Sequence, residues 1–573
     1  MIAIAAVASV ALATIGLGAW GVRLARTTSD LFVASRAVTP WWNAAAISGE
    51  YLSAASFLGI AGLHMRIGAA ALWLPLGFTA GYLALLLFVA APLRRYGSYT
   101  IPDFAEARLA SPRVRTLAAV VVLTIGAMYL VPQLKGAGLT LGEITGAPYW
   151  LGILIVGAIV AGNVGLGGMR GITYVQAFQY WVKTFAIALP ACLLLIHLGG
   201  LPERAALFGR ELPSAGPSGL VVELDDAQRV QFPRATSYTL DGRPQRAAAG
   251  EERVLPAGRL QLPPGAAVPV ADGTTPKPGV EWAEPVSPGG DASPVFVYSL
   301  LLATFLGTMG LPHILVRFYT NPDGPAARRT TVRVLGLLGL FYLFPAVYGL
   351  LGRVLVPELY VTGETDVVVL RLPEVAWPGL PGELLGALVA AGAFAAFMST
   401  ASGLLVSVSG TLSFDLWGRS DRSAVRRRRA FRVAALAGMV VPALLALGAR
   451  RLDISLLVGW AFAVAASTFC PLLLLGIWWS RLTTAGAATG MVAGGLTASG
   501  CILTGLLIGD GNGEVMEALL AQPAAVSVPL AFATMIGVSL RGRRRSDWRA
   551  QMLALHGPEG LGLEELGLGR RVT

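Results

Sequence analysis

Apolar runs long enough to cross a membrane recur along almost the whole chain. Each holds roughly twenty mostly apolar residues, which as a helix span a hydrocarbon core of about 30 Å. Mean hydropathy is +0.65, and 13% of residues are charged, whereas soluble domains average about 25%. The sequence therefore predicts an all-α polytopic membrane protein. We expect about thirteen spans, near residues 2–22, 40–63, 69–92, 116–141, 149–168, 172–197, 293–315, 333–354, 382–413, 432–449, 454–478, 484–508 and 524–540.

Arginines alternate from loop to loop along this series. The loops after odd-numbered spans are rich in them, as at Arg94, Arg317, Arg328 and the run 426–429, whereas the other short loops hold few. By the positive-inside rule, the N-terminus lies outside and the C-terminus in the cytoplasm of a cell-membrane protein. The net charge of +11 thus reflects cytoplasmic loops next to membrane lipid, and no nucleic-acid partner is expected.

Little in the sequence points to an enzyme. The three cysteines, Cys192, Cys470 and Cys501, lie in or near apolar runs and form neither a disulfide framework nor a zinc-binding spacing. No nucleophile triad or phosphate-binding loop is present. The basic cytoplasmic tail, residues 541–573, is too short for a catalytic or signalling domain. A transport role is therefore expected.

Residues 198–292 interrupt the apolar pattern between the sixth and seventh spans. They are polar and rich in Gly and Pro, and the arginine pattern places them outside the membrane. We expect a flexible extracytoplasmic insert. Within it, "LVVELDDAQRVQF" and "ATSYTLDGRPQ" have strand-like patterns that can form a short β-hairpin.

The second span contains a carboxylate in "AAISGEYLSAASFLGI". Glu50 lies about 15 Å into the predicted helix, close to the bilayer midplane. Charged groups at this depth are costly and usually mark functional sites. A structural role, in which Glu50 is only hydrogen-bonded within the bundle, is an alternative of equal weight. Ser48, Gly49 and Ser53 are poor choices for a continuous lipid-facing helix and favour a break in it.

The seventh span has a second break signal in "GTMGLPH", residues 307–313. Spans two and seven are five apart, the spacing of an inverted repeat of five plus five helices with two discontinuous helices. The expected organisation is a first peripheral helix and first repeat in 1–197, the insert in 198–292, the second repeat in 293–478, peripheral helices in 479–540 and the tail in 541–573.

The ninth span adds hydroxyl groups. Ala396, Ser399 and Thr400 are spaced i, i+3 and i+4, so they share one helix face. Such residues often serve only as contacts between helices. Beside a broken helix, two hydroxyls and freed carbonyls instead form an oxygen cage suited to a hard cation such as sodium.

Several motifs resemble the sodium/solute symporter family, and within it the cation/acetate symporters. They are "SDLFVASRAVTPWWNAAAISGEYLSAASFLGIAG", "RRYGSYTIPDFAEARL", "GGMRGITYVQAFQ", "GTMGLPHILVRFYT", "AAFMSTASGLLVSVSGTLSFDLW" and "VGWAFAVAASTFCPLLLLGIWWSRLTTAGAATG". The resemblance implies a leucine-transporter-type fold that works by alternating access. It also implies a sodium site made by the carbonyls of Ala44, Ile47 and Ala396 and the hydroxyls of Ser399 and Thr400.

The sequence departs from this branch at two positions. Glu50 stands where the branch usually has Asp, which puts a direct role in sodium binding in doubt, and Lys135 stands where an apolar residue is usual. We assign both to coupling or gating. Lys135 can draw anions inward or simply extend to the outer interface. Lys183, deep in the sixth span, must be paired or face water.

A small carboxylate needs donors near the helix breaks. The candidates are Tyr51, Ser53, Tyr129, Gln133 and Thr308; for each, ordinary interhelical hydrogen bonding is the alternative. The predicted function is sodium-coupled symport of acetate or another short-chain monocarboxylate. A proton-coupled symporter with Glu50 as the titrating group, and a sensor built on a transporter fold, remain the alternatives.

Overall fold

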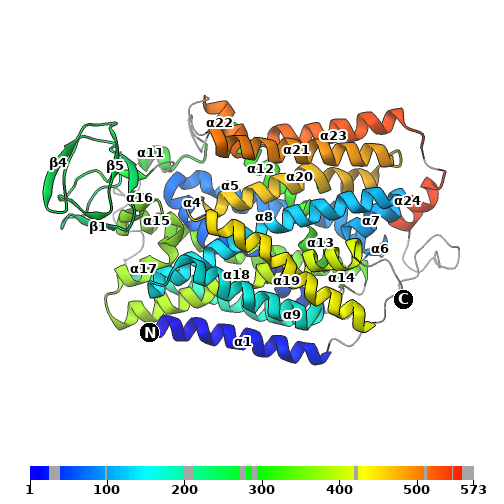
Figure 1. Ribbon diagram of the computed structural model, residues 1–573, viewed down its shortest axis with the longest axis horizontal. Coiled ribbons are helices and arrows are strands. Elements are labelled where there is room, and N and C mark those ends of the chain that lie inside the picture. Colours follow the sequence, from blue (N-terminus) through cyan, green and yellow to red (C-terminus); the bar gives the residue numbers. More distant parts are fainter. Residues whose placement is uncertain are drawn as a thin grey trace.

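The computed structural model is a bundle of long helices with a small β-fold at one end (Figure 1). The α1 helix starts at the end that carries the β-fold, and α24, the last described helix, lies at the opposite end. The structure describes residues 1–24, 39–96, 98, 100–197, 212–271, 279–286, 293–318, 320–321, 323–417, 424–508, 513–544 and 546–557.

The described residues contain 12 helical segments long and apolar enough to cross a membrane. One of them, Ala55–Tyr96, is 42 residues long and holds the second half of predicted span two together with span three. The chain turns between these parts at Gly68, whose φ of +66° lies in the left-handed region that favours glycine. This joined segment accounts for the difference from the thirteen predicted spans.

Helices make up nearly all of the bundle. The first half contains α1 (Ile2–Leu24), α3 (Pro40–Tyr51), the π-turn η2 (Ala55–Gly59), α4 (Ile60–Ile67), η3 (Gly68–Leu72), α5 (Trp73–Leu85), η4 (Leu86–Ala90), α6 (Ala91–Tyr96), α7 (Ile101–Leu109), α8 (Pro112–Thr145) and α9 (Tyr149–His197). The second half contains α12 (Pro294–Gly310), α13 (Pro312–Phe318), α14 (Gly324–Tyr342), α15 (Pro345–Leu355), α16 (Glu358–Thr362), η6 (Thr365–Val367), α17 (Val368–Ala376), α18 (Leu380–Gly410), η7 (Thr411–Leu416), α19 (Ala424–Gly448) and α20 (Ile454–Trp478). The C-terminal helices are α21 (Thr484–Ile508), α22 (Glu514–Ala521), α23 (Ala524–Arg541) and α24 (Trp548–His556).

Two helices form the centre of the bundle. In the most apolar stretches of α18 and α20, 83% and 89% of the residues are buried, against 22% in α1 and α21. The outer helices expose large apolar side chains such as Leu12, Leu436 and Leu496. On a soluble protein so much exposed apolar surface would be unusual, but in a bilayer it faces lipid tails.

Part of the insert is an ordered β-fold, so the expectation of a flexible segment is wrong for residues 212–271. One sheet has the order β1-β6-β3-β4 and the other β5-β2-β7. The strands are β1 (Leu220–Leu224), β2 (Gln228–Gln231), β3 (Thr236–Leu240), β4 (Arg243–Ala247), β5 (Glu252–Leu255), β6 (Gly258–Leu262) and β7 (Val270–Ala271). Alternate apolar residues such as Val222, Tyr238 and Leu260 are buried between them, which stabilises the fold through a core of its own.

The predicted hairpin is present in one of the two motifs. β3 and β4 are joined by Asp241 and Gly242, both with positive φ, as two-residue hairpin turns require. β1 and β2 instead pair with β6 and β5. The fold packs on α16, and after it α11 (Gly279–Trp282) is tied to the bundle by the hydrogen bond from Trp282 Nε1 to the Met65 carbonyl at 3.0 Å.

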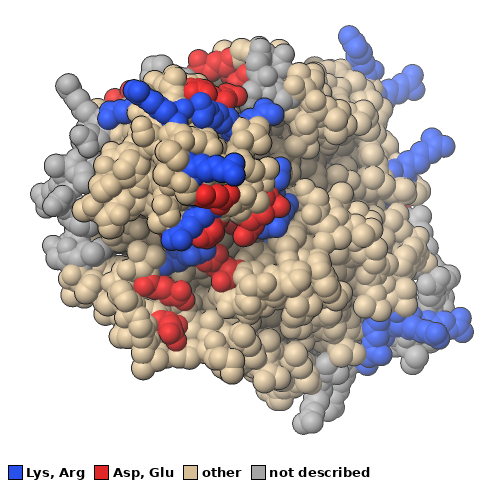
Figure 2. Space-filling view, turned by 60° about the vertical axis from the view of Figure 1, so that its left-hand side comes forward, with Lys and Arg blue, Asp and Glu red and all other residues tan. Residues whose placement is uncertain are grey.

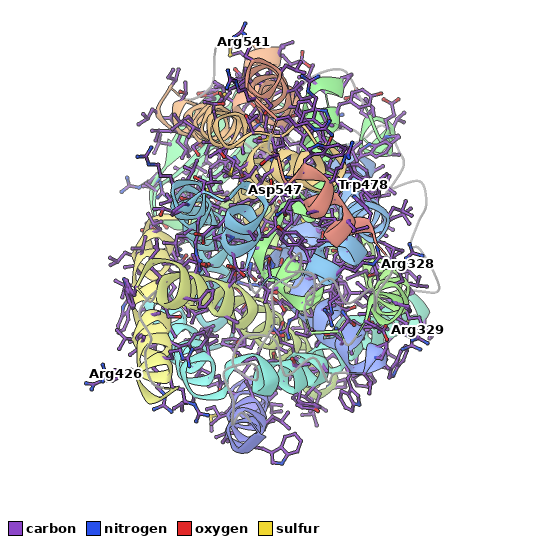
Figure 3. All side chains as sticks on the ribbon, turned by 90° about the vertical axis from the view of Figure 1, so that its right-hand side faces the viewer. Arg328, Arg329, Arg426, Trp478, Arg541 and Asp547 are labelled. Atoms are coloured by element: carbon purple, nitrogen blue, oxygen red, sulfur yellow. The ribbon has the colours of Figure 1, made fainter. Side chains whose placement is uncertain are left out.

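Arginines gather at the end of the bundle opposite the β-fold. Arg328, Arg329, Arg426 and Arg541 lie around its rim and point away from it (Figure 3). This arrangement is consistent with a cytoplasmic position for that end. The side on which each end lies stays a prediction.

We predict that the β-fold is outside the cell. In a variant whose three cysteines are replaced by alanine, a cysteine at the exposed Arg243 should react with a membrane-impermeant maleimide in intact cells. A cysteine at Ser546, near α24, should react only after permeabilisation. Labelling in the reverse order would contradict the predicted topology.

Candidate functional site

The predicted break in the second span is present. α3 ends at Tyr51, and Leu52 has φ −72° and ψ 89°, outside the helical region. The chain resumes as the π-turn η2 at Ala55. The backbone carbonyls in the last turn of α3 therefore lack their usual helical donors and need other partners within the bundle.

The second predicted break is present in the seventh span. α12 ends at Gly310, Leu311 is extended with ψ 117°, and α13 starts at Pro312. Proline fits here because it has no backbone N–H to leave unpaired at the start of a helix. Both discontinuous helices were thus predicted correctly from Gly, Ser and Pro.

Side chains from α8, α9 and α18 satisfy the broken end of α3. Ser399 Oγ donates to the Gly49 carbonyl at 2.7 Å, and Thr400 Oγ1 donates to the Glu50 carbonyl at 2.5 Å. The side-chain oxygen of Gln133 accepts from the Ala54 N–H at 2.9 Å. The hydroxyl pair on α18 therefore faces the break, as its spacing predicted.

The ammonium of Lys183 lies against the same carbonyls. It donates to the Leu52 carbonyl at 2.6 Å, to Ser399 Oγ at 2.8 Å and to the Gly49 carbonyl. Gly49 has to be glycine, because a Cβ there would overlap with the Gln176 carbonyl of α9. This close approach of α3 and α9 brings the lysine within reach of the break.

The five predicted sodium ligands are buried together, but only partly connected. The Ala396 carbonyl accepts a hydrogen bond at 3.0 Å from the Oγ atom of Ser399, which lies one turn later in α18. Ala44 and Ile47 lie in the preceding turns of α3, fully buried. Within the described residues, the hydroxyls of Ser399 and Thr400 contact carbonyls of Gly49 and Glu50. They do not contact the carbonyls of those two residues in the preceding turns.

Glu50 forms a buried ion pair with Arg317. The Arg317 Nε atom lies 2.5 Å from Glu50 Oε2, and both side chains are essentially inaccessible to solvent. Arg317 also donates to Thr173 Oγ1 at 2.8 Å and to Gln176 Oε1. We counted Arg317 as a loop arginine, which is wrong. It belongs to α13, so this pair links the two discontinuous helices.

The five predicted substrate residues lie around the breaks. Tyr51 Oη is 2.8 Å from Thr308 Oγ1, and the Tyr129 side chain is hydrogen-bonded to Ser53. Gln133 also donates to the Tyr129 carbonyl at 3.3 Å, so both ends of its amide are occupied by backbone atoms. Gln133 therefore braces the break, and the hydroxyl residues are the better candidates for contact with a solute.

Aromatic rings close this region. Tyr51 packs edge-on against Tyr82 with ring centroids 4.6 Å apart, and Tyr129 packs in the same way against Phe462 at 5.6 Å and His313 at 5.3 Å. All five side chains are buried. The residues around the breaks are therefore inaccessible to solvent in this conformation.

Two polar groups in this aromatic cluster lack partners. Among the described residues, the Tyr82 hydroxyl and both ring nitrogens of His313 are buried without a hydrogen bond. His313 lies at the start of α13, directly after Pro312. Buried polar groups are nearly always satisfied in folded proteins, so a water or a polar solute is expected beside them.

Lys135 is paired instead of extending to the interface. Its ammonium lies 3.0 Å from Asp366 Oδ2, which also accepts from the Ile454 N–H at 3.1 Å. This pair lies at the edge of a cavity of about 540 Å³ between the bundle and the β-fold. Arg66, Asp453 and Arg229 also line the cavity, and Figure 2 shows the charged side chains gathered on this face.

The profile of the sodium:solute symporter family matches residues 31–227 and 268–494. The uncharacterized symporter YwcA of Bacillus subtilis (strain 168) is 30% identical over 516 residues, covering 88% of each chain. The chain belongs to the sodium:solute symporter family. It is therefore a multi-pass membrane transporter, and its family makes a solute and sodium the expected cargo.

Solved structures show the fold independently. A sodium-coupled sialic acid symporter in a substrate-bound, outward-open state superposes with a TM-score of 0.66 at 13% identity, covering 95% of this chain and 98% of that one. Mhp1, a nucleobase-cation-symport-1 family transporter, gives a TM-score of 0.50 at 13% identity and covers 92% and 99%. The fold is the leucine-transporter type that the paired breaks predicted.

Sequence reasoning missed Arg317, Gln176, Tyr82 and His313 as members of the site. His313 follows the proline of the second break, and Gln176 lies near the start of the sixth predicted span, so a search for polar residues anywhere within the predicted spans would have found both. Arg317 resembled a loop arginine because it follows the seventh span. Its burial depends on contacts with residues more than 100 positions away.

We predict that the loss of Arg317 is partly compensated when the charge of Glu50 is also removed. Arg317→Met should destabilise the protein by about 3–5 kcal/mol, because it leaves the Glu50 carboxylate buried and uncompensated. Glu50→Gln in the Arg317→Met background should recover part of this loss. Thermal unfolding in detergent measures both effects, and equal stability of the single and double variants would contradict the pairing.

Proposed function

We propose that the protein carries a small monocarboxylate, such as acetate, together with sodium by alternating access. The carrying observation is an excess of positive charge at the break, because the cations of Arg317 and Lys183 share one nearby carboxylate, that of Glu50. Arg317 is paired with Glu50, whereas Lys183 contacts two carbonyls and one hydroxyl. An uncompensated charge in a low-dielectric bundle is costly. A bound monoanion would offset it.

The two buried side chains without hydrogen-bond partners among the described residues favour a solute that carries hydrogen-bond acceptors. The Tyr82 hydroxyl and the N–H of a neutral His313 are donors, and a carboxylate offers acceptor oxygens to both. The surrounding rings of Tyr51, Tyr129 and Phe462 are closely packed, which favours a short apolar chain.

Sodium is favoured as the coupling ion by the family and by the hydroxyl pair on α18. A cation held by hydroxyls and freed carbonyls has the hard oxygen ligands that it prefers. A proton-coupled mechanism with Glu50 as the titrating group is less favoured, because Arg317 binds that carboxylate directly.

We predict that purified protein in proteoliposomes accumulates labelled acetate, propionate or pyruvate when an inward sodium gradient is imposed. Accumulation should be lost without the gradient. A proton gradient alone should not replace it. Uptake that follows the proton gradient and ignores sodium would favour the alternative, and the absence of uptake for every monocarboxylate would contradict the solute class.

We further predict that Tyr82→Phe raises the KM for the carried monocarboxylate about tenfold, which corresponds to 1.4 kcal/mol. The thermal stability should be unchanged or slightly higher, because the removed hydroxyl has no partner among the described residues. Tyr51→Phe is the matched comparison. Its hydroxyl is bonded to Thr308, so it should lose about 1 kcal/mol of stability. An unchanged KM in Tyr82→Phe would remove Tyr82 from the solute site.

A further inference from the structure

Lys183 forms no direct ion pair among the described residues, because the nearby Glu50 carboxylate is bound by Arg317. It lies in α9, is fully buried, and uses its three N–H donors on the Gly49 carbonyl, the Leu52 carbonyl and Ser399 Oγ. An ammonium has three donors and no acceptor, so these three oxygens satisfy it completely. They are the carbonyls freed by the break in α3 and one of the two hydroxyls on α18.

We propose that the Lys183 ammonium is a tethered cation in the sodium position, so that sodium binds at the break in α3 only when Lys183 has moved away. The inference rests on the proposed function in one respect, which is that Ser399 and Thr400 are ligands of the coupling ion. Carbonyl and hydroxyl oxygens suit an ammonium and a hard metal cation alike. The two rival cations thus share Ser399 Oγ at the break in α3.

The two cations exclude each other for two reasons. Both need Ser399 Oγ as a ligand, and like charges a few ångströms apart repel strongly where the dielectric constant is low. When one state of a protein blocks a site, the apparent affinity falls in proportion to the fraction that is free to bind. If Lys183 occupies the position in about 99 of 100 molecules, sodium binds roughly 100-fold more weakly than at the free site.

A variant at Thr400 distinguishes competition by Lys183 from a general weakening of the sodium site. Its hydroxyl donates to the Glu50 carbonyl, whereas Lys183 contacts Ser399. Removing the Thr400 hydroxyl should therefore weaken sodium alone. Removing the Ser399 hydroxyl should weaken both sodium and its competitor.

The first test measures binding of radioactive sodium to purified protein without any organic solute. Lys183→Met and Lys183→Gln should each lower the sodium concentration for half-saturation by about tenfold or more. Thr184→Val is the control, because the next residue in the helix points about 100° away, and it should bind like the wild type. An unchanged or raised half-saturating concentration in both lysine variants would overturn the proposal.

The second test works even if the lysine variants fail to fold. In the protein that retains Lys183, Thr400→Val should raise the half-saturating sodium concentration about tenfold, as the loss of one good ligand does. Ser399→Ala should raise it less than about threefold, because its competitor loses the same ligand. Equal shifts, or a larger shift for Ser399→Ala, would overturn the competition.

A double variant completes the cycle. In the Lys183→Met background no competitor remains, so Ser399→Ala should now raise the half-saturating concentration by the full tenfold or so. A purely structural role for Lys183 predicts the same effect of Ser399→Ala in both backgrounds. Because every readout is sodium binding, these tests remain decisive even if no monocarboxylate is transported, and uptake tests the proposed function separately.

Discussion

The break in α3 at Leu52 is the constraint on which the surrounding structure depends. Ending a helix in the middle of an apolar bundle exposes backbone groups that cannot reach water. The structure satisfies them with side chains from three other helices, namely Gln133 of α8, Lys183 of α9, and Ser399 and Thr400 of α18. The same polar groups that repair the break also provide oxygen atoms of the kind that can hold a hard cation.

Among the described residues near the break, charged side chains form direct ion pairs with one exception. Glu50 and Arg317 neutralise each other between the two discontinuous helices, and Lys135 and Asp366 do so between α8 and the segment before α17. Such pairs hold helices in a defined arrangement, but they are stable only while both members are present. Lys183 relies on carbonyl and hydroxyl dipoles instead, which makes it the group that a bound anion or a rival cation would affect most.

Alternating access requires the helices around the break to have more than one arrangement. In the described conformation the solute candidates, Tyr51 and Tyr129 among them, are buried. The charged cavity between the bundle and the β-fold lies further toward the end that carries the insert. The β-fold lines this cavity through Arg229 and Ala271, and none of its described residues is among the candidate ion ligands.

Local sequence determined the spans, both breaks and the face of α18 that carries Ser399 and Thr400. Each follows from hydropathy, from Gly, Ser and Pro within apolar runs, or from helical spacing, and these act over a few residues. The ordered β-fold was missed because its Gly- and Pro-rich composition resembles that of a flexible segment, while its order comes from a small shared core. Only the tertiary structure decided the partners of Glu50, Lys135 and Lys183. Those contacts join residues more than 100 positions apart, and sequence patterns show that a buried charge needs a partner without showing which one the fold brings near.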